Sequence, residues 1–190
     1  MNPIPDPGQL RAELVHRALP EFERPLIGYA TSITHDHDAA RDIVQDTFLK
    51  LWIHEDPASL DGPGLKPWLY TVCRNRSLDW LRRRHRLVSL DSDSFAQFAA
   101  STPEPADAVS SRDDAADVLR YFQRLPANQA ECLRLKFQHD LSYKEIAAAT
   151  GLTVTNVGFL IHTGLKRLRQ LLTPPASRAT AASPLLPLPN

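Results

Sequence analysis

Residues 65–86 constrain the fold most, because their apolar residues recur at the spacing of an α-helix. Pro67 suits the first turn of such a helix, where its missing N–H does no harm. One side of the helix carries the residues that we expect to face a core: Leu69, Val72, Cys73 and Trp80. The stretch therefore predicts a long helix, packed along one side and open to a partner along the other.

The other side of this helix mixes an aromatic ring with hydrogen-bonding groups, at Trp68, Thr71, Asn75, Asp79 and Arg82. Such groups can stack on a base or hydrogen-bond to it. The helix then ends in a cluster of cations suited to phosphate: Arg82, Arg83, Arg84, His85 and Arg86. An Arg-rich helix end can also be a merely solvated surface, but the stripe beside it favours nucleic acid as the partner.

The formal net charge of the chain is zero, yet the charge is unevenly distributed. Residues 65–86 hold seven basic residues against one acidic, a net charge of +6, and residues 87–117 carry −6. A polyanionic partner is therefore compatible with overall neutrality, because attraction depends on the local field. The cysteines, Cys73 and Cys132, form no CxxC pair, so we predict neither zinc nor disulfides, and a reduced cytoplasmic protein.

Two helices are expected before this stretch. A helical pattern covers residues 9–32, and we expect Pro20 and Pro25 to kink or split it. The second helix covers residues 36–55, with Asp36 or Asp38 as its N-cap. The residues before position 9 have neither the basic nor the apolar part of a signal peptide, and no apolar run approaches a membrane span.

The second helix has more apolar surface than one core contact needs. A core stripe is supplied by Val44, Phe48 and Leu51. A second apolar face, mixed with acids, is formed by Leu49, Trp52 and Ile53. Trp52 can anchor a protein partner or pack on the preceding helix, and the pattern alone allows both.

A change in composition divides the chain into two domains. Residues 56–64 read as a turn-forming connector, and residues 87–111 as a flexible acidic linker. The second domain, residues 112–172, begins with expected helices over 113–124 and 128–138; the packing residues of the latter are Ala130, Leu133, Leu135 and Phe137. Residues 173–190 form a Pro-rich tail that is either disordered or docks through its leucines, Leu185, Leu186 and Leu188.

The end of the second domain predicts a helix-turn-helix. Ser142 and Glu145 have the spacing of a capping box, Gly151 ends that helix, and Thr153 caps the next. The inner face of the next helix is Val157, Ile161, Leu165, Leu168 and Leu172. Its outward residues at the entry point to DNA are Thr155, Asn156 and Phe159, and its cations follow two turns later. Such units also serve as pure packing elements.

Taken together, DAARDIVQDTFLKLW, LKPWLYTVCRNRSLDWLRRR and LSYKEIAAATGLTVTNVGFLIHTGLKRLRQLL resemble the bacterial sigma factors of the extracytoplasmic-function group. The resemblance covers about residues 10–172. It implies an all-α fold of two small helical domains, over 9–86 and 112–172, that binds RNA polymerase core and directs it to promoters. It implies no cofactor, and an anti-sigma factor as a further partner. Residue patterns for catalysis are absent from the sequence, and His35 and His37 around Asp36 suit a solvated helix cap better than a metal.

The resemblance also implies residue roles. The contact with the clamp helices of the polymerase β′ subunit would be made by Asp42, Gln45, Asp46, Phe48 and Trp52. The −10 element would be melted and read by Lys66, Trp68, Thr71, Asn75, Asp79, Arg82, Arg83 and Arg84. The helix-turn-helix would meet the β flap and read the −35 element through Thr155, Asn156, Phe159, Lys166 and Arg167.

One stretch departs from the family pattern. Family members carry basic and hydroxyl-rich residues where this chain has Asn156 to Ile161, without a cation. Contact with the −35 element is then weaker, or reads a different element, or the surface serves a protein. Two other functions stay open at this point: a regulator that binds duplex DNA through the helix-turn-helix without polymerase, and an RNA-binding regulator that uses the Arg cluster.

Overall fold

A computed structural model describes residues 7–91, 121–122 and 124–172, of which residues 7 and 87–91 are described by their backbone only. Every regular element in these ranges is helical, which confirms the expected all-α class. The elements are α1 (Pro7–Thr34), α2 (His37–Trp52), the 3₁₀ helix η1 (Pro57–Leu60), α3 (Leu65–Asp91), α5 (Ala127–Phe137), α6 (Tyr143–Thr150) and α7 (Val154–Leu172). Most of the expected helix over 113–124, most of the linker and the tail lie outside the described residues; Tyr121 and Phe122, near the end of that helix, are helical.

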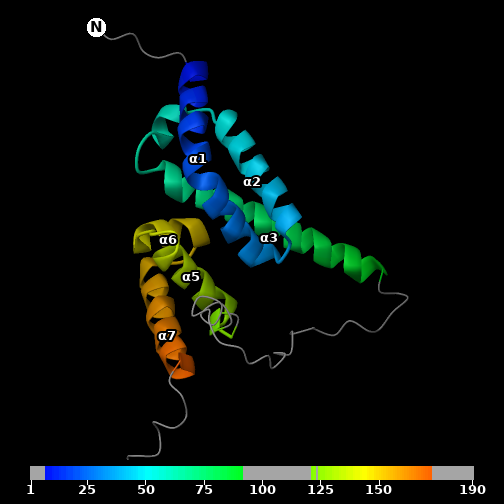
Figure 1. Ribbon diagram of the computed structural model, residues 1–190, viewed down its shortest axis with the longest axis vertical. Helices are drawn as coiled ribbons and strands as arrows, with labels where there is room; N and C mark the ends of the chain where they lie inside the picture. Colours follow the sequence, from blue (N-terminus) through cyan, green and yellow to red (C-terminus); the bar gives the residue numbers. More distant parts are fainter. Residues whose placement is uncertain (1–6, 92–120, 123, 173–190) are drawn as a thin grey trace, which may run out of the picture.

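The first domain packs α1, α2 and α3 around one core (Figure 1). The expected core stripe of α2 is confirmed, since Val44, Phe48 and Leu51 are all buried. On α3 only part of the expected core stripe is confirmed. Leu69 and Cys73 are fully buried and Trp80 is half-buried, whereas Val72 stays outside the core; Tyr70 and Ser77 are buried instead.

The two prolines do not split α1, so the expected split is wrong. Pro20 and Pro25 both lie on the exposed side of a helix that runs unbroken from Pro7 to Thr34. A proline in a helix removes the bond to the carbonyl four residues earlier, here those of His16 and Glu21. Both residues are exposed, so water can satisfy the freed carbonyls.

The local signals at helix ends are confirmed. Asp36 is the N-cap of α2, and its Oδ1 accepts a hydrogen bond of 3.0 Å from the Ala39 N–H. Ser142 and Glu145 form the complete capping box of α6, and Gly151 ends that helix at φ 73°. The axes of α6 and α7 are bent by 104° at this turn, within the range typical of a helix-turn-helix.

Two packing expectations in the second domain are wrong. Phe137 and Leu172 are 61% and 52% exposed. On α5 the buried residues are Ala130, Cys132, Leu133 and Leu135, which spread over more than one stripe. The reason is that α5 packs on α7 and also contacts the first domain through Glu131 and Arg74. Leu172 lies in the last turn of α7, whose length of about 28 Å exceeds the roughly 17 Å of α5.

Alanine substitutions at two glycines of α7 should change the stability of the chain in opposite directions. A Cβ at Gly164 would lie 2.8 Å from Cδ1 of buried Leu133, whereas one at Gly158 would lie 3.6 Å from Tyr143, an ordinary contact. Gly158→Ala should therefore raise the free energy of unfolding by about 0.5–1 kcal/mol through helix propensity. Gly164→Ala should lower it by about 1 kcal/mol, because overpacking outweighs the same gain. Denaturant unfolding of both variants measures these changes in the free energy of unfolding. Changes of the same sign in the two variants would contradict the prediction.

Candidate functional site

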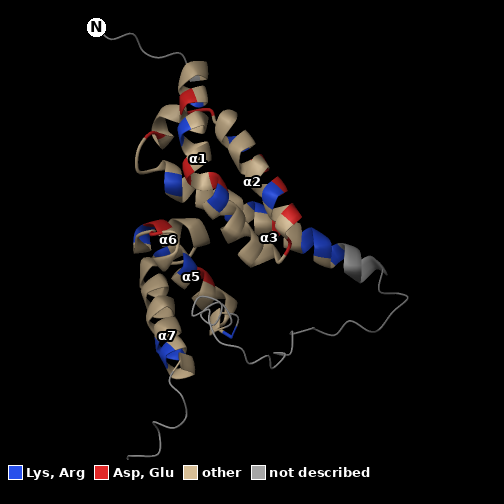
Figure 2. Cartoon of the chain, viewed as in Figure 1, with Lys and Arg blue, Asp and Glu red and all other residues tan. Residues whose placement is uncertain are grey.

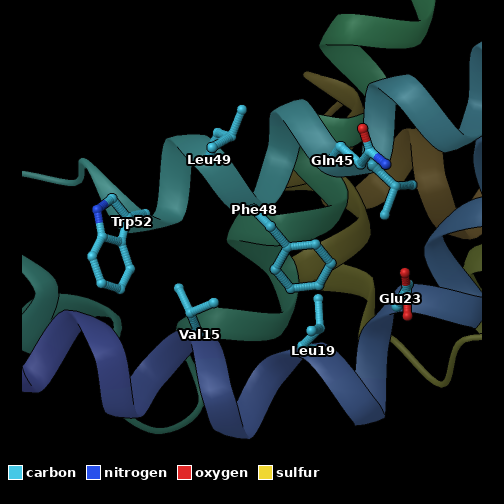
Figure 3. A pocket seen from close by; sticks show the side chains of 8 residues that line it. Val15, Leu19, Glu23, Gln45, Phe48, Leu49 and Trp52 are labelled. Carbon is cyan, nitrogen blue, oxygen red and sulfur yellow. The ribbon is translucent and has the colours of Figure 1, made fainter.

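The outer face of α2 leaves large apolar side chains in solvent. Leu49, Trp52 and Ile53 are 60%, 49% and 70% exposed, as the sequence predicted for a second face. Beside them, α1 and α2 enclose a shallow hollow (Figure 3). Its lining is mostly apolar and comprises Val15, Leu19, Glu23, Val44, Gln45, Phe48, Leu49 and Trp52. Exposed apolar groups that surround a hollow are typical of a protein-docking surface.

The residues expected at this docking surface differ in accessibility. Asp42 and Gln45 are exposed, and Asp46 forms an ion pair of 3.3 Å with Arg76 of α3. Phe48 is 7% exposed, so it can present only the floor of the hollow to a partner. Trp52 lies at the rim of the hollow on the side of α1 and still exposes half of its surface, so packing and docking are both compatible with its position.

The polar stripe of α3 lies on the surface but is partly engaged. Asn75 is exposed, whereas Trp68, Thr71 and Asp79 are half-buried. The Trp68 ring meets His54 edge-on at 5.2 Å, and the Thr71 hydroxyl donates to the Pro67 carbonyl at 2.7 Å. The indole of Trp68 is thereby held in place, and Asn75 exposes its amide to solvent.

The far end of α3 carries the cation cluster. Figure 2 shows this basic end projecting beyond α1 and α2. Arg82, Arg83 and Arg84 are all exposed. Arg82 pairs with Asp79 at 2.6 Å, and the Arg84 guanidinium lies 5.1 Å from the ring centroid of Trp80. Asp79 thus positions an arginine, and the row of guanidinium groups stays open to phosphate.

The start of α7 is exposed as expected for a reading helix. Thr155, Asn156 and Phe159 all face solvent, and Phe159 exposes 63% of its surface. Lys166 and Arg167 are exposed further along the helix. The entry turns therefore offer a hydroxyl, an amide and an aromatic ring, and the charges lie about 15 Å away along the axis.

A polar contact between the two domains was not foreseen from the sequence. Glu131 of α5 forms a bidentate ion pair with Arg74 of α3, at 2.8 and 3.1 Å, and accepts a hydrogen bond of 2.8 Å from the Tyr29 hydroxyl. Burial acts to lower the pKa of Arg74, but the hydrogen bond and charge of Glu131 outweigh it and the pKa is raised. Burial, reinforced by Glu131, raises the pKa of Tyr29.

The same contact half-buries the imidazole of His139. Nδ1 of His139 lies 2.8 Å from the Tyr70 hydroxyl, and its ring meets the Tyr29 ring edge-on at 5.6 Å. Burial lowers the pKa of His139 to about 4, with help from the charges of Lys66 and Arg134. His139 is therefore neutral at physiological pH, and its protonation opposes the packing of the second domain on the first.

Acidification should destabilise the chain through His139. Because its folded pKa is about 4 and its unfolded pKa about 6.5, its contribution is complete above pH 6.5 and is lost as the pH falls towards 4. Between pH 7 and pH 5 the free energy of unfolding should fall by about 2 kcal/mol from this group. Denaturant unfolding at both pH values measures the loss, and His139→Gln should remove it. An unchanged loss in that variant would contradict the assignment.

The part of the chain that the structure describes contains no candidate metal site. No group of three or more His, Cys, Asp or Glu side chains in them is placed to hold a metal ion. No single described helix is long and apolar enough to cross a membrane.

Known proteins match both domains. Residues 21–87 match the family described as Sigma-70 region 2, and residues 115–168 match Sigma-70, region 4. The ECF RNA polymerase sigma factor SigM of Bacillus subtilis is 29% identical over 144 residues, covering 75% of this chain and 85% of SigM. SigL of Mycobacterium tuberculosis is 29% identical over 162 residues, covering 85% of this chain and 90% of SigL.

Two solved structures are also similar to this chain. The sigma factor RpoE of Bartonella quintana, solved in complex with the anti-sigma factor NepR, is 30% identical with a TM-score of 0.64, covering 84% of this chain and 97% of RpoE. CnrH, solved with the cytosolic domain of CnrY, has a TM-score of 0.57 at 23% identity, covers 86% of this chain and 92% of CnrH, and supports the fold alone.

Two helical domains that match regions 2 and 4 in order define a sigma factor of the sigma-70 class. Within that class the chain belongs to the extracytoplasmic-function group, as the sequence resemblance predicted. It is an alternative sigma factor that binds RNA polymerase core and promoter DNA to initiate transcription. A helix-turn-helix regulator that acts without polymerase is not favoured.

Proposed function

We propose that α2 docks on the clamp helices of the polymerase β′ subunit while α3 melts and reads the −10 element. The observation that carries this proposal is that two unlike surfaces belong to one packed unit. The exposed apolar side chains Leu49, Trp52 and Ile53 lie at the C-terminal end of α2. The ion pairs Asp46–Arg76 and Asp36–Arg84 join the middle and the N-terminal end of α2 to the basic half of α3. One rigid unit can therefore hold the polymerase and an unpaired strand together. The protein acts as a binding factor in the bacterial cytoplasm and not as an enzyme.

The surface of α3 suits a separated strand. Its stripe runs from Trp68 to Arg84, about 24 Å along the helix axis. A base that leaves the duplex can stack on an aromatic ring and hydrogen-bond to an amide, which Trp68 and Asn75 supply. Arg82, Arg83 and Arg84 then hold the phosphates next to that base.

We propose that α7 reads the −35 element and that its domain meets the β flap. Asparagine reads adenine in the major groove, and apolar or methyl groups contact the methyl of thymine. Asn156 supplies the contact with adenine, and Thr155 and Phe159 supply the contact with the thymine methyl. The phosphates near this element are held by Lys166 and Arg167, later in the helix than is usual in the family.

Two substitutions on α7 should have different effects on promoter choice. Asn156→Ala should relax the preference at one base pair of the −35 element by about 1–3 kcal/mol. Lys166→Ala should weaken all promoters about equally, because a phosphate contact carries no sequence information. Transcription from a library with a randomised −35 element measures both. A uniform loss with Asn156→Ala would contradict its reading role.

An anti-sigma factor is a further proposed partner. RpoE of Bartonella quintana was solved with the anti-sigma factor NepR, and the similarity to this chain covers nearly the whole of RpoE. A protein that covers the hollow between α1 and α2 would compete with polymerase for Trp52. We therefore expect such a factor to inhibit by occupying the same exposed face.

The proposed function is tested by transcription in vitro. Purified chain is added to core polymerase over a library of promoter fragments, and the transcripts are sequenced. We expect initiation from a restricted set of sequences, only when chain and core are both present. Specific binding to duplex DNA by the free chain, without promoter-dependent transcription after addition of core, would refute the proposal.

A further inference from the structure

We propose that the free chain rests in a closed form, in which the second domain masks a basic row of α3 that promoter DNA needs. In this form the Glu131 carboxylate occupies the place of a DNA phosphate on Arg74. The proposal rests on the proposed function of α3, and it adds Arg74 to the residues that contact DNA.

The ion pair has the geometry of phosphate recognition. Nε and Nη2 of Arg74 face the two carboxylate oxygens of Glu131 at 2.8 and 3.1 Å, and both side chains are largely covered, at 17% and 15% exposed. A guanidinium binds a phosphate through the same two parallel hydrogen bonds. The Tyr29 hydroxyl completes the site by donating to Glu131.

The contact covers a complete row of α3. Lys66, Tyr70 and Arg74 follow one another at intervals of four residues, so they lie on one side of the helix. Each is bonded to the second domain: Lys66 Nζ donates to the Asp140 carbonyl at 3.3 Å, Tyr70 pairs with His139, and Arg74 pairs with Glu131. The row adjoins Thr71 and Asn75 of the polar stripe. A strand that crosses the stripe would meet these two cations if the second domain moved away.

The separation of the two promoter elements requires that movement. Elements centred near −10 and −35 lie about 25 base pairs apart, roughly 85 Å along B-form DNA. In the structure α6 of the second domain lies against α3 (Figure 1), so the two reading surfaces cannot reach both elements at once. The chain between Asp91 and Tyr121 holds 29 residues, which can span about 95 Å when extended. The closed form is therefore incompatible with simultaneous binding, and the chain length allows opening.

The chemistry of the contact suits a closed form that DNA can open. A buried ion pair gains little over separated partners, because desolvation offsets the attraction. DNA phosphates can replace Glu131 on Arg74 without leaving a buried charge. Removal of the Glu131 charge, in contrast, leaves Arg74 covered and unpaired, which favours opening.

Glu131→Gln tests the proposal in the free, full-length chain. The matched control is Glu21→Gln, which removes the same charge from an exposed position on α1. Small-angle X-ray scattering should give a larger radius of gyration for Glu131→Gln and an unchanged one for the control. Fluorescence anisotropy with labelled (dT)15 should show binding that is about tenfold tighter. The salt dependence should steepen by about 1.4 in log–log slope, for two additional phosphate contacts on a single strand.

A charge exchange separates closure from DNA contact. Arg74→Glu with Glu131→Arg should restore the small radius of gyration, because the pair is re-formed with reversed sign. Arg74→Ala with Glu131→Gln should stay open but lose about half of the added salt slope. An unchanged radius of gyration in Glu131→Gln, or an open form with unchanged (dT)15 binding, would overturn the proposal. Neither measurement involves polymerase. A failed transcription test would therefore refute the proposed function without changing the expected radius of gyration or (dT)15 binding.

Discussion

Trp52→Ala should weaken binding of the chain to core polymerase by about 30-fold or more. Trp52 is the one aromatic residue on the exposed face of α2, it stands at the rim of the hollow beside α1, and half of its surface is free. Exposed tryptophans beside a hollow are typical of the few residues that dominate an interface, where truncation costs about 2 kcal/mol or more. Titration of labelled chain with core polymerase measures the dissociation constant.

The matched control for Trp52 is Phe137→Ala. Phe137 is also an aromatic residue at a helix end and is more exposed, at 61%, but it lies in the second domain on α5. Its truncation should change core binding less than threefold. Equal losses in the two variants, or no loss in Trp52→Ala, would show that the outer face of α2 is not the docking surface. Far-UV circular dichroism establishes that both variants keep their helices.

Replacing Arg82, Arg83 and Arg84 together by alanine should abolish most promoter opening. The three guanidinium groups are exposed on the projecting end of α3, where basic residues follow one another in the sequence. Each phosphate contact on a single strand contributes about 0.7 to the log–log salt slope, so the slope should fall by about 2. Open-complex formation by the holoenzyme is followed with permanganate, and its salt dependence gives the slope.

A charge-conserving variant is the control for the arginine cluster. With lysine at positions 82, 83 and 84 the salt slope should be retained, because a point charge also neutralises a phosphate. A slope that stays unchanged in the alanine variant would mean that the cluster does not contact the strand. A slope that falls equally in both variants would mean that geometry, not charge, determines the effect.

The features that follow from local rules were predictable from the sequence. The cap at Asp36, the capping box of Ser142 with Glu145, and the turn at Gly151 each depend on residues within a few positions of one another. The two faces of α2 were equally readable, because burial there follows the helical period. The split of α1 was wrongly predicted, since the cost of a proline depends on whether the freed carbonyl meets solvent, which the sequence does not state.

The contact between the domains was beyond sequence reasoning for a physical reason. Glu131 lies 57 residues from Arg74 and 102 from Tyr29, and no periodicity relates positions so far apart. Arg74 therefore counted only as one more cation of a basic helix, and nothing in the sequence singled out Glu131. Phe137 was assigned to the core for a related reason: α5 buries residues on two sides, and which sides those are depends on the neighbouring domain.

The length of α3 has a kinetic consequence. The helix has 27 residues, about 40 Å, and the second domain covers only its first half, so Arg82 to Arg84 stand clear of the covered row by roughly 12 Å or more. A chain in its resting state therefore still presents its most strongly charged tip to passing DNA. Capture at the tip raises the local concentration of phosphate around Arg74, so that the polyanion itself helps to displace Glu131.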